Sequence, residues 1–320
     1  MKICILGAGA FAIALCKVLE QDENDITMWT KFEEEKELLL KTRENEKLFP
    51  GVKIDESVKI TTNLNDAVKG KDVIINVLPF VALEDTVNDL SKIYNPNQII
   101  LSTTKGLDAN TFKTSTEYIT DVIKNARVVA ISGPSFAIDI VNKENVSFML
   151  ASNDKEALET VEKLFERDYL TLEETDDIKG IQIAGVIKNA IAIGAGMLDS
   201  LKASESTKAA FIAKGMTDMT KIIVSLGGKK ETCYSYAGIG DLILTCMSDT
   251  SRNYTFGTLL GKGLTKETAI EKMNGKTVEG YNMVKALYTY TKNNNIKTDV
   301  IEILYKIIFE DNDINLIKKV

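Results

Sequence analysis

The stretch that decides the fold is Lys2-Ile3-Cys4-Ile5-Leu6-Gly7-Ala8-Gly9-Ala10-Phe11-Ala12, near the start of the 320-residue chain. Five strand-forming residues lead into the pattern Gly-x-Gly-x-x-Ala, and residues 13–20 have the composition of a helix. In such a turn Gly7 permits the tight bend, Gly9 lets the backbone approach phosphates, and Ala12 lets the helix pack close to the sheet. The N–H groups and the dipole at the helix start attract an anion. We therefore predict a dinucleotide site here; the alternative is a plain strand–helix turn.

Short apolar, strand-like runs alternate with helical patterns up to residue 177. Apolar runs without period-two alternation indicate strands buried on both faces, and helical patterns separate them. Further strands are predicted at residues 25–29, 58–62, 72–77, 98–102 and 127–132. We predict an α/β fold for residues 1–177, a Rossmann-like, doubly wound and mainly parallel sheet that binds the dinucleotide. In such sheets ligands bind at the carboxyl ends of the strands.

From about residue 178 the character changes to long helical segments. These are predicted at residues 178–201, 207–226, 265–273, 277–293 and 300–309. The chain is long enough for two domains with sizeable cores. We therefore predict that residues 178–320 form an all-helical domain that binds substrate and carries the catalytic residues.

Composition excludes several kinds of function. The net charge of −7 gives no support to nucleic-acid or anionic-membrane binding, so an anionic ligand needs a local basic pocket. The four cysteines are scattered without metal-ligand spacing, so we predict neither a metal site nor disulfides. The chain contains no histidine, and a general base must therefore be Lys, Asp, Glu, Tyr or Cys.

The start of the chain lacks the apolar stretch of a signal peptide. No run reaches the roughly 18 apolar residues that span a bilayer. We therefore expect a cytoplasmic protein without stable membrane insertion.

Cofactor choice depends on the end of the second strand, Met28-Trp29-Thr30-Lys31. An acidic residue there binds the ribose of NAD, whereas a basic residue suits the 2′-phosphate of NADP. Lys31 favours NADP slightly, although Glu33 to Glu35 could offset it. The alternative makes Lys31 a surface lysine at a helix start.

Two later strand ends carry ligand-binding residue types. Lys105-Gly106 follows the strand at 98–102, where a lysine can reach a phosphate or remain a solvated loop residue. Ser132-Gly133-Pro134-Ser135-Phe136-Ala137 forms a strand end, a turn and a helix start. Ser135 stands where it could cap that helix or present its hydroxyl to a ligand.

Lys188 and Asn189 interrupt an almost wholly apolar helical stretch. Lysine is rarely buried without a partner, and desolvation makes it a plausible base near neutral pH. The alternative is a lysine whose stem lets the charge reach solvent.

Further along, Asp241 and Thr245 share one helix face at i, i+4 spacing. Asp241 could cap its helix or pair with Lys188. In Ser251-Arg252-Asn253, the arginine can bind a phosphate with two N–H groups and the asparagine can add a donor.

Together these stretches resemble the bacterial-type NAD(P)-dependent glycerol-3-phosphate dehydrogenases. The match runs in order along nearly the whole chain and also includes Leu48-Phe49-Pro50-Gly51 and Val278-Glu279-Gly280. The resemblance implies reversible reduction of dihydroxyacetone phosphate to sn-glycerol 3-phosphate, which supplies glycerophospholipid synthesis. It implies that Lys188 accepts the proton in oxidation and donates it in reduction, with Asp241 and Thr245 as its polar partners.

The resemblance also implies two sets of binding residues. Those around the substrate are Lys105, Gly133, Ser135, Lys188, Asp241, Ser251, Arg252 and Asn253. Those that contact NADP or NAD are Gly7, Gly9, Ala10, Phe11, Ala12, Trp29, Lys31, Lys105, Ala137, Arg252 and Glu279. Lys31 stands where the family commonly has arginine, which weakens the inference for NADP. The segment Ser204-Glu205-Ser206-Thr207-Lys208 departs from the family pattern, so we leave it out of the site.

Two other functions fit part of the pattern. A two-domain dehydrogenase acting on a β-hydroxy acid also uses a lysine on the first helix of its second domain, but would not need Ser251-Arg252-Asn253. A non-catalytic NAD(P) sensor would leave the buried Lys188 without a role, at a cost in stability. We expect a small-molecule substrate, no nucleic-acid partner, and a homodimer as the commonest default.

Overall fold

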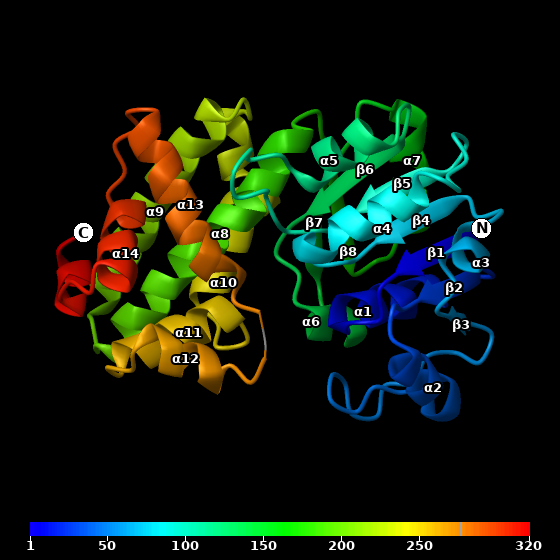
Figure 1. The fold of residues 1–320 in the computed structure, drawn as a ribbon, viewed down its shortest axis with the longest axis horizontal. Coiled ribbons are helices and arrows are strands. Elements are labelled where there is room, and N and C mark those ends of the chain that lie inside the picture. The colour runs from blue at the N-terminus through cyan, green and yellow to red at the C-terminus, as the bar shows by residue number, and fades with distance from the viewer. Residues whose placement is uncertain (276) are drawn as a thin grey trace. The chain divides into compact units, whose positions relative to one another are not determined.

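The computed structural model describes residues 1–275 and 277–320, which divide into two compact units (Figure 1). The first contains Met1–Lys105 and Lys113–Ile178, and the second contains Gly106–Phe112 and Lys179–Val320. The sequence predicted a single boundary, with domains 1–177 and 178–320. The observed division differs at Gly106–Phe112, because Leu107 and Phe112 are buried in the apolar core of the second unit.

The first unit is built on an eight-stranded sheet with the order β3-β2-β1-β4-β5-β6-β7-β8. The strands are β1 (Lys2–Leu6), β2 (Asp25–Trp29), β3 (Lys59–Thr61), β4 (Val73–Asn76), β5 (Ile99–Ser102), β6 (Arg127–Ser132), β7 (Val146–Ala151) and β8 (Leu170–Thr175). Neighbouring strands are parallel except β6 and β7, which are antiparallel. The predicted mainly parallel sheet is therefore confirmed. The strand order reverses at β1, where Leu6 lies beside Trp29 of β2 and Asn76 of β4.

Helices cover both faces of this sheet because its strands are apolar on both sides. Ile3 and Ile5 of β1 pack into one core, to which α1 (Ala10–Leu19), α6 (Ala137–Val141) and α7 (Lys155–Leu164) contribute. Cys4 and Leu6 pack into the opposite core, to which α3 (Leu64–Val68), α4 (Leu83–Leu90) and α5 (Ser115–Val122) contribute. The remaining elements are α2 (Glu33–Thr42) and η1 (Phe80–Ala82). The doubly wound arrangement leaves the carboxyl ends of the parallel strands as the place for a ligand.

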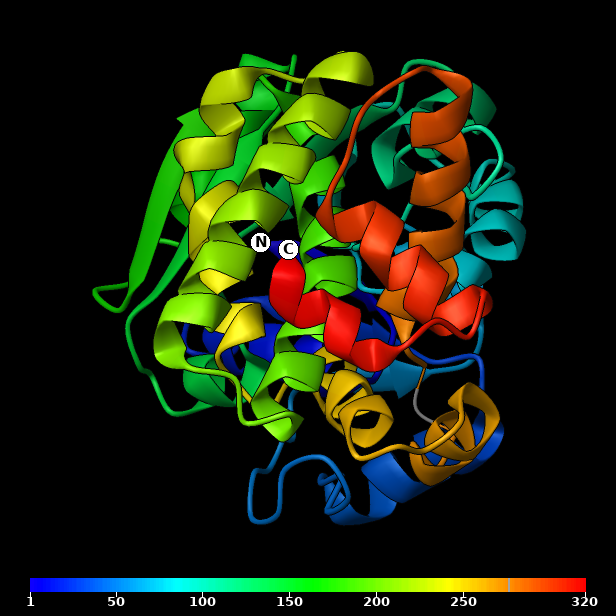
Figure 2. The ribbon, with the colours of Figure 1, turned by 90° about the vertical axis from the view of Figure 1, so that its left-hand side faces the viewer.

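The second unit is helical, as predicted. Its elements are α8 (Ile178–Ser200), α9 (Glu205–Ser225), η2 (Lys230–Tyr234), η3 (Tyr236–Gly240), α10 (Asp241–Cys246), α11 (Arg252–Gly261), α12 (Lys266–Lys272), α13 (Glu279–Asn293), α14 (Val300–Phe309) and η4 (Ile314–Lys319). Figure 2 shows α13 in orange packed beside α14 in orange-red.

Helix α8 corrects one expectation from the sequence. It is long and apolar enough to cross a membrane by length and composition alone, whereas we expected no such segment. Its apolar window is entirely buried inside the structure, as in the core helix of a folded domain. A helix surrounded by other helices is apolar on every side, which accounts for its composition.

Helix α11 crosses α8 at very short range. A Cβ atom on Gly257 of α11 would lie 1.8 Å from the carbonyl oxygen of Ile193. One on Gly196 of α8 would lie 2.0 Å from the carbonyl oxygen of Tyr254. Only glycine fits at either position, and the contact fixes the start of α11, at Arg252, relative to the helix that carries Lys188.

Candidate functional site

The glycine turn after β1 has the geometry that an anion requires. Gly7 has a φ of 122°, a conformation that favours glycine. Gly9 is the N-cap of α1, and no side chain caps the N–H groups of the first turn. Apart from its own chain neighbours and helix backbone, a Cβ atom on Gly9 would meet no atom of residues 1–275 and 277–320 within 4 Å, so packing among these residues does not require glycine there. A pyrophosphate lying against this turn does require it, and the dinucleotide therefore fits the residues present.

The end of β2 offers one basic side chain. Trp29 is buried, and its indole N–H donates to the carbonyl oxygen of Thr62 at 3.0 Å. The hydroxyl of Thr30 donates to Glu35. Lys31 is 65% exposed, and its Nζ lies 3.8 Å from a carboxylate oxygen of Asp85. An exposed pair of this kind holds a lysine only weakly, so Lys31 can turn to another anion.

Two further predicted residues meet at Gly133, after β6. Lys105 Nζ donates to the carbonyl oxygen of Gly133 at 3.4 Å, and Ser135 Oγ donates to the same oxygen at 3.1 Å. The alternative that Ser135 caps a helix is wrong. The N-cap of α6 is Phe136, with no side-chain cap, because the hydroxyl of Ser135 turns back to Gly133.

The second unit contains a buried cluster around Lys188, in the middle of α8. Lys188, Asp241 and Thr245 are 6%, 1% and 3% exposed. The ammonium of Lys188 donates to Asp241 Oδ1, and also to Thr245 Oγ1 at 2.8 Å. Thr245 Oγ1 in turn donates to the carbonyl oxygen of Asp241 at 2.7 Å, since the two residues lie one turn apart on α10. We call these three residues the lysine centre.

The geometry rejects the simpler roles considered for these residues. Lys188 is only 6% exposed, so its stem does not carry the charge out to solvent. Asp241 is the first residue of α10 and the N-cap is Gly240, so Asp241 does not cap the helix. Cys246, the next residue after Thr245, lies beside the cluster. Burial raises the pKa of its thiol to about 12, so the thiol stays protonated and neutral near Lys188.

A second group of polar side chains lies at the starts of α11 and α13. Arg252 is about half exposed, and its Nη2 lies 3.7 Å from Glu279 Oε1. Asn189 Nδ2 donates to Glu279 Oε2 at 3.1 Å. Asn253 Oδ1 accepts the N–H of Gly280 at 2.9 Å. Glu279 is thus held between the helix that carries Lys188 and the helix that begins at Arg252.

The sequence analysis missed the part that Asn189 plays in this group. The signal was present, because Asn189 interrupts the same apolar stretch as Lys188. A Cβ atom on Gly280 would lie 2.5 Å from the carbonyl oxygen of Asn189, so α13 begins directly against α8. Ser251, the remaining predicted residue here, is the N-cap of α11 and accepts the N–H of Tyr254 at 3.3 Å.

The predicted residues therefore form two sets, one in each unit. The first unit carries the glycine turn, with Gly7, Gly9, Ala10, Phe11 and Ala12; the β2 end, with Trp29 and Lys31; and Lys105, Gly133, Ser135 and Ala137. The second unit carries Lys188, Asp241, Thr245, Ser251, Arg252, Asn253 and Glu279.

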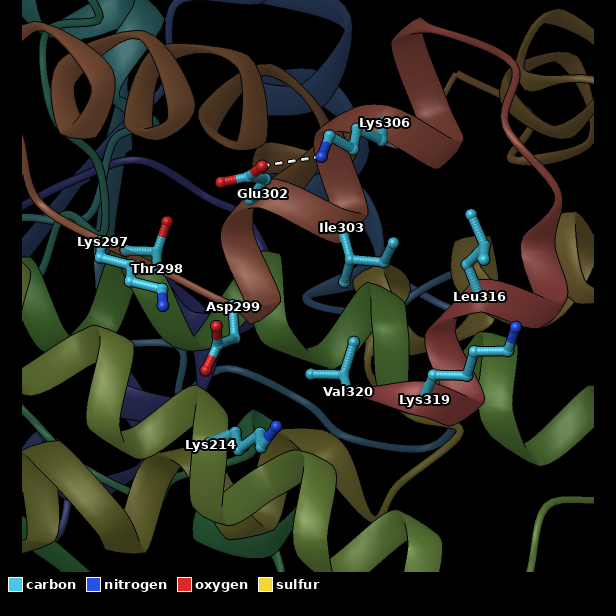
Figure 3. A pocket seen from close by; sticks show the side chains of 10 residues that line it. All are labelled: Lys214, Lys297, Thr298, Asp299, Glu302, Ile303, Lys306, Leu316, Lys319 and Val320. Atoms are coloured by element: carbon cyan, nitrogen blue, oxygen red, sulfur yellow. Dashed lines mark hydrogen bonds and ion pairs between the residues drawn. The ribbon is translucent and has the colours of Figure 1, made fainter.

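A cavity of about 350 Å³ elsewhere in the second unit contains none of these residues (Figure 3). Lys214, Lys297, Lys306 and Lys319 lie around it, together with Asp299 and Glu302. The charge of Lys306 is taken up by Glu302, whose oxygen lies 2.7 Å from its Nζ. The cavity is lined by none of the residues of the lysine centre, so it is not the candidate active site.

Two family models match the chain and together cover nearly all of it. The model for the N-terminus of NAD-dependent glycerol-3-phosphate dehydrogenase matches residues 2–158, and the model for its C-terminus matches residues 177–319.

Relatives match over similar lengths. The glycerol-3-phosphate dehydrogenase [NAD(P)+] of Fusobacterium nucleatum is 34% identical over 97% of this chain and 93% of its own. That of a Thermoanaerobacter species is 34% identical over 97% and 93%. The crystal structure of glycerol-3-phosphate dehydrogenase from Coxiella burnetii has a TM-score of 0.93 and 27% identity, over 99% of this chain and 97% of that one. The chain belongs to the NAD-dependent glycerol-3-phosphate dehydrogenase family and is an NAD(P)-dependent oxidoreductase.

Proposed function

We propose that the chain reduces dihydroxyacetone phosphate reversibly to sn-glycerol 3-phosphate, with Lys188 as the proton donor. The single observation that carries the proposal is the lysine centre, a buried ammonium held by one carboxylate and one hydroxyl. A chain without histidine needs another group to move this proton, and Lys188 is buried with a defined orientation.

The chain's residues divide the remaining work. The nicotinamide cofactor supplies the hydride when bound. Asp241 and Thr245 orient the ammonium of Lys188 toward the carbonyl oxygen of the substrate, and Lys188 delivers its proton there. In the reverse direction Lys188, once deprotonated, takes the proton from the substrate hydroxyl.

Phosphate binding is the second part of the proposal. Arg252 can donate two parallel N–H groups to a phosphate, and Lys105 adds a point charge. Asn253, Ser251, Ser135 and Gly133 supply further polar contacts around the substrate. These charges are local, because the chain as a whole carries a net charge of −7. A phosphate-free hydroxy acid would leave Arg252 without a ligand.

The cofactor is bound by the glycine turn, with Phe11, Ala137 and Glu279 adding contacts. Lys31 gives a slight preference for NADPH over NADH, since it is the basic side chain at the end of β2. We further propose that the product supplies glycerophospholipid synthesis, and that the protein works in the cytoplasm as a homodimer.

Oxidation of NADPH and of NADH, measured in parallel after adding dihydroxyacetone phosphate to purified protein, tests this function. We expect turnover with the phosphorylated triose and none with phosphate-free keto acids. A higher rate with NADPH than with NADH would support binding of the 2′-phosphate by Lys31. Turnover only with keto acids would contradict the substrate. Cofactor binding without any turnover would point to a sensor.

A further inference from the structure

A buried hydrogen-bond network joins the carboxyl ends of β4 and β5. Asn76 ends β4, Thr103 and Thr104 follow β5, and these residues are 3%, 8% and 6% exposed. Asn76 Nδ2 donates to Thr104 Oγ1, and Thr104 Oγ1 donates to the carbonyl oxygen of Leu78, both at 2.9 Å. The N–H and the hydroxyl of Thr103 both donate to the carbonyl oxygen of Asn76, at 3.0 and 3.1 Å. The network therefore ties the chain that leaves β5 to the chain that leaves β4.

The last residue of this network, Thr104, directly precedes Lys105 in the sequence. Lys105 is the last residue of the first unit before Gly106–Phe112, which belongs to the second. Lys105 also reaches across to the end of β6, where its Nζ lies 3.4 Å from the carbonyl oxygen of Gly133. Hydrogen bonds to the end of β4 thus hold the main chain just before Lys105, and the side chain of Lys105 points to the end of β6.

The side-chain amide of Asn76 is only partly satisfied. Its Oδ1 is buried and has no hydrogen-bond partner among residues 1–275 and 277–320. A buried acceptor without a partner is destabilising, and an apolar residue of similar size would avoid that cost. Such a residue could not supply the amide N–H that Thr104 accepts. Local features that lower stability are expected where a chain serves a ligand.

We propose that Asn76 and Thr104 are positioning residues for Lys105. They hold its main chain so that the ammonium reaches the phosphate of the substrate. This inference rests on the proposed function, in which Lys105 binds dihydroxyacetone phosphate. A displaced ammonium makes a weaker charge-assisted hydrogen bond to the phosphate, so loss of the support should weaken substrate binding.

Two substitutions of Thr104 separate its hydroxyl from its shape. Thr104→Val keeps the branched side chain but loses both hydrogen bonds, whereas Thr104→Ser keeps the hydroxyl. We expect Thr104→Val to raise KM for dihydroxyacetone phosphate about tenfold, with kcat changed by less than about threefold. We expect Thr104→Ser to keep KM for dihydroxyacetone phosphate within about twofold of the wild-type value.

Ser102→Ala is the matched control. Ser102 is the last residue of β5, two positions before Thr104, and is 2% exposed, but its hydroxyl pairs with that of Ser115 at 2.7 Å rather than with β4. Its loss should leave KM unchanged. A rise in KM equal to that of Thr104→Val would mean that any buried hydroxyl here has the same effect, and would overturn the proposal.

A double-mutant cycle with Lys105→Ala decides whether Thr104 acts through Lys105. If it does, kcat/KM of Thr104→Val/Lys105→Ala equals that of Lys105→Ala alone within about twofold. If the losses of kcat/KM caused by the two single substitutions multiply in the double variant, the proposal is overturned.

Turnover of the wild-type protein tests the proposed function separately. Hydrogen exchange of the amides of Val77, Leu78 and Phe80 and of residues 103–106 tests the network without any turnover. Thr104→Val should speed this exchange about tenfold, and Thr104→Ser and Ser102→Ala should not. Unchanged exchange in Thr104→Val would overturn the proposal even in an active enzyme.

Discussion

Asp241→Asn removes the negative charge beside Lys188 and leaves the size of the side chain almost unchanged. Asp241 and Lys188 are 1% and 6% exposed, so neither charge is well solvated. Removing one member of a buried ion pair costs about 3–5 kcal/mol, because the other charge is left uncompensated. The variant can avoid much of that cost by releasing the proton of Lys188. Since one pH unit corresponds to about 1.4 kcal/mol, the proton should be lost about 2–3 pH units lower.

The pH profile of kcat/KM for reduction of dihydroxyacetone phosphate measures this change. In the proposed reaction, reduction needs the proton on Lys188, so the profile should fall on the alkaline side where that proton is lost. We expect this alkaline limb to lie about 2–3 pH units lower in Asp241→Asn than in the wild type. Initial rates, followed by the absorbance of the reduced cofactor between about pH 6 and about pH 10, give the profile.

Thr245→Val is the matched control for this experiment. It removes the other partner of the Lys188 ammonium, which is neutral, and leaves the charge of Asp241 in place. Its alkaline limb should move by less than about one pH unit, because a neutral acceptor stabilises the ammonium less than a carboxylate does. An unmoved limb in Asp241→Asn, or equal shifts in both variants, would refute the role of Asp241 as counter-ion. Thermal unfolding of each variant establishes that the compared proteins are folded.

Three further outcomes are expected. Lys188→Met should lower kcat about a thousandfold or more while the Kd for NADPH stays within about twofold, and near-normal turnover would remove Lys188 from proton transfer. Arg252→Ala should raise KM for dihydroxyacetone phosphate at least about tenfold, because a charge-assisted hydrogen bond to the phosphate is lost; an unchanged KM would argue against phosphate binding by Arg252. Asp218 accepts the N–H groups of Asp299, Val300 and Ile301 at 3.2, 2.7 and 3.2 Å, and burial raises the pKa of its carboxyl above the usual 3.8. The folded chain therefore binds the proton of Asp218 more tightly than the unfolded chain does. The free energy of unfolding of the wild type should fall relative to that of Asp218→Asn as the pH rises from about 4 to about 7. Denaturant unfolding of both proteins at these two pH values measures the change, and an equal difference between the proteins at both pH values would contradict the prediction.

The parallel part of the sheet could be predicted because each strand is apolar on both faces. Ile3 and Ile5 face one core while Cys4 and Leu6 face the other, so a two-layer pattern was encoded in consecutive residues. The antiparallel pairing of β6 with β7 was not encoded in this way. Either direction of β7 buries the same apolar side chains, and the choice depends on how the connection through α6 turns the chain.

Segments that cross between units are harder to predict than segments that stay within one. Gly106–Phe112 follows β5 and precedes α5 of the first unit, so its place in the sequence favours that unit. Its two large apolar residues pack instead in the core of the second unit, where Phe112 contacts the ring of Tyr290 at 4.7 Å between centroids. A contact between residues so far apart in sequence leaves no periodic signal in either segment.

The same distinction explains which site residues sequence reasoning can find. Lys188 is visible because a charge inside an apolar helix contradicts its surroundings, and Asp241 follows as the buried opposite charge that it needs. Asn76 and Thr104 carry no such contradiction, since polar residues are ordinary where a strand ends. Their importance lies in the direction of their hydrogen bonds across two strands, 28 residues apart in sequence, which composition and spacing do not specify. A buried charge such as that of Lys188 can thus be predicted from the apolar residues around it in the sequence, whereas a network such as that of Asn76 and Thr104 becomes visible only when the strands are paired.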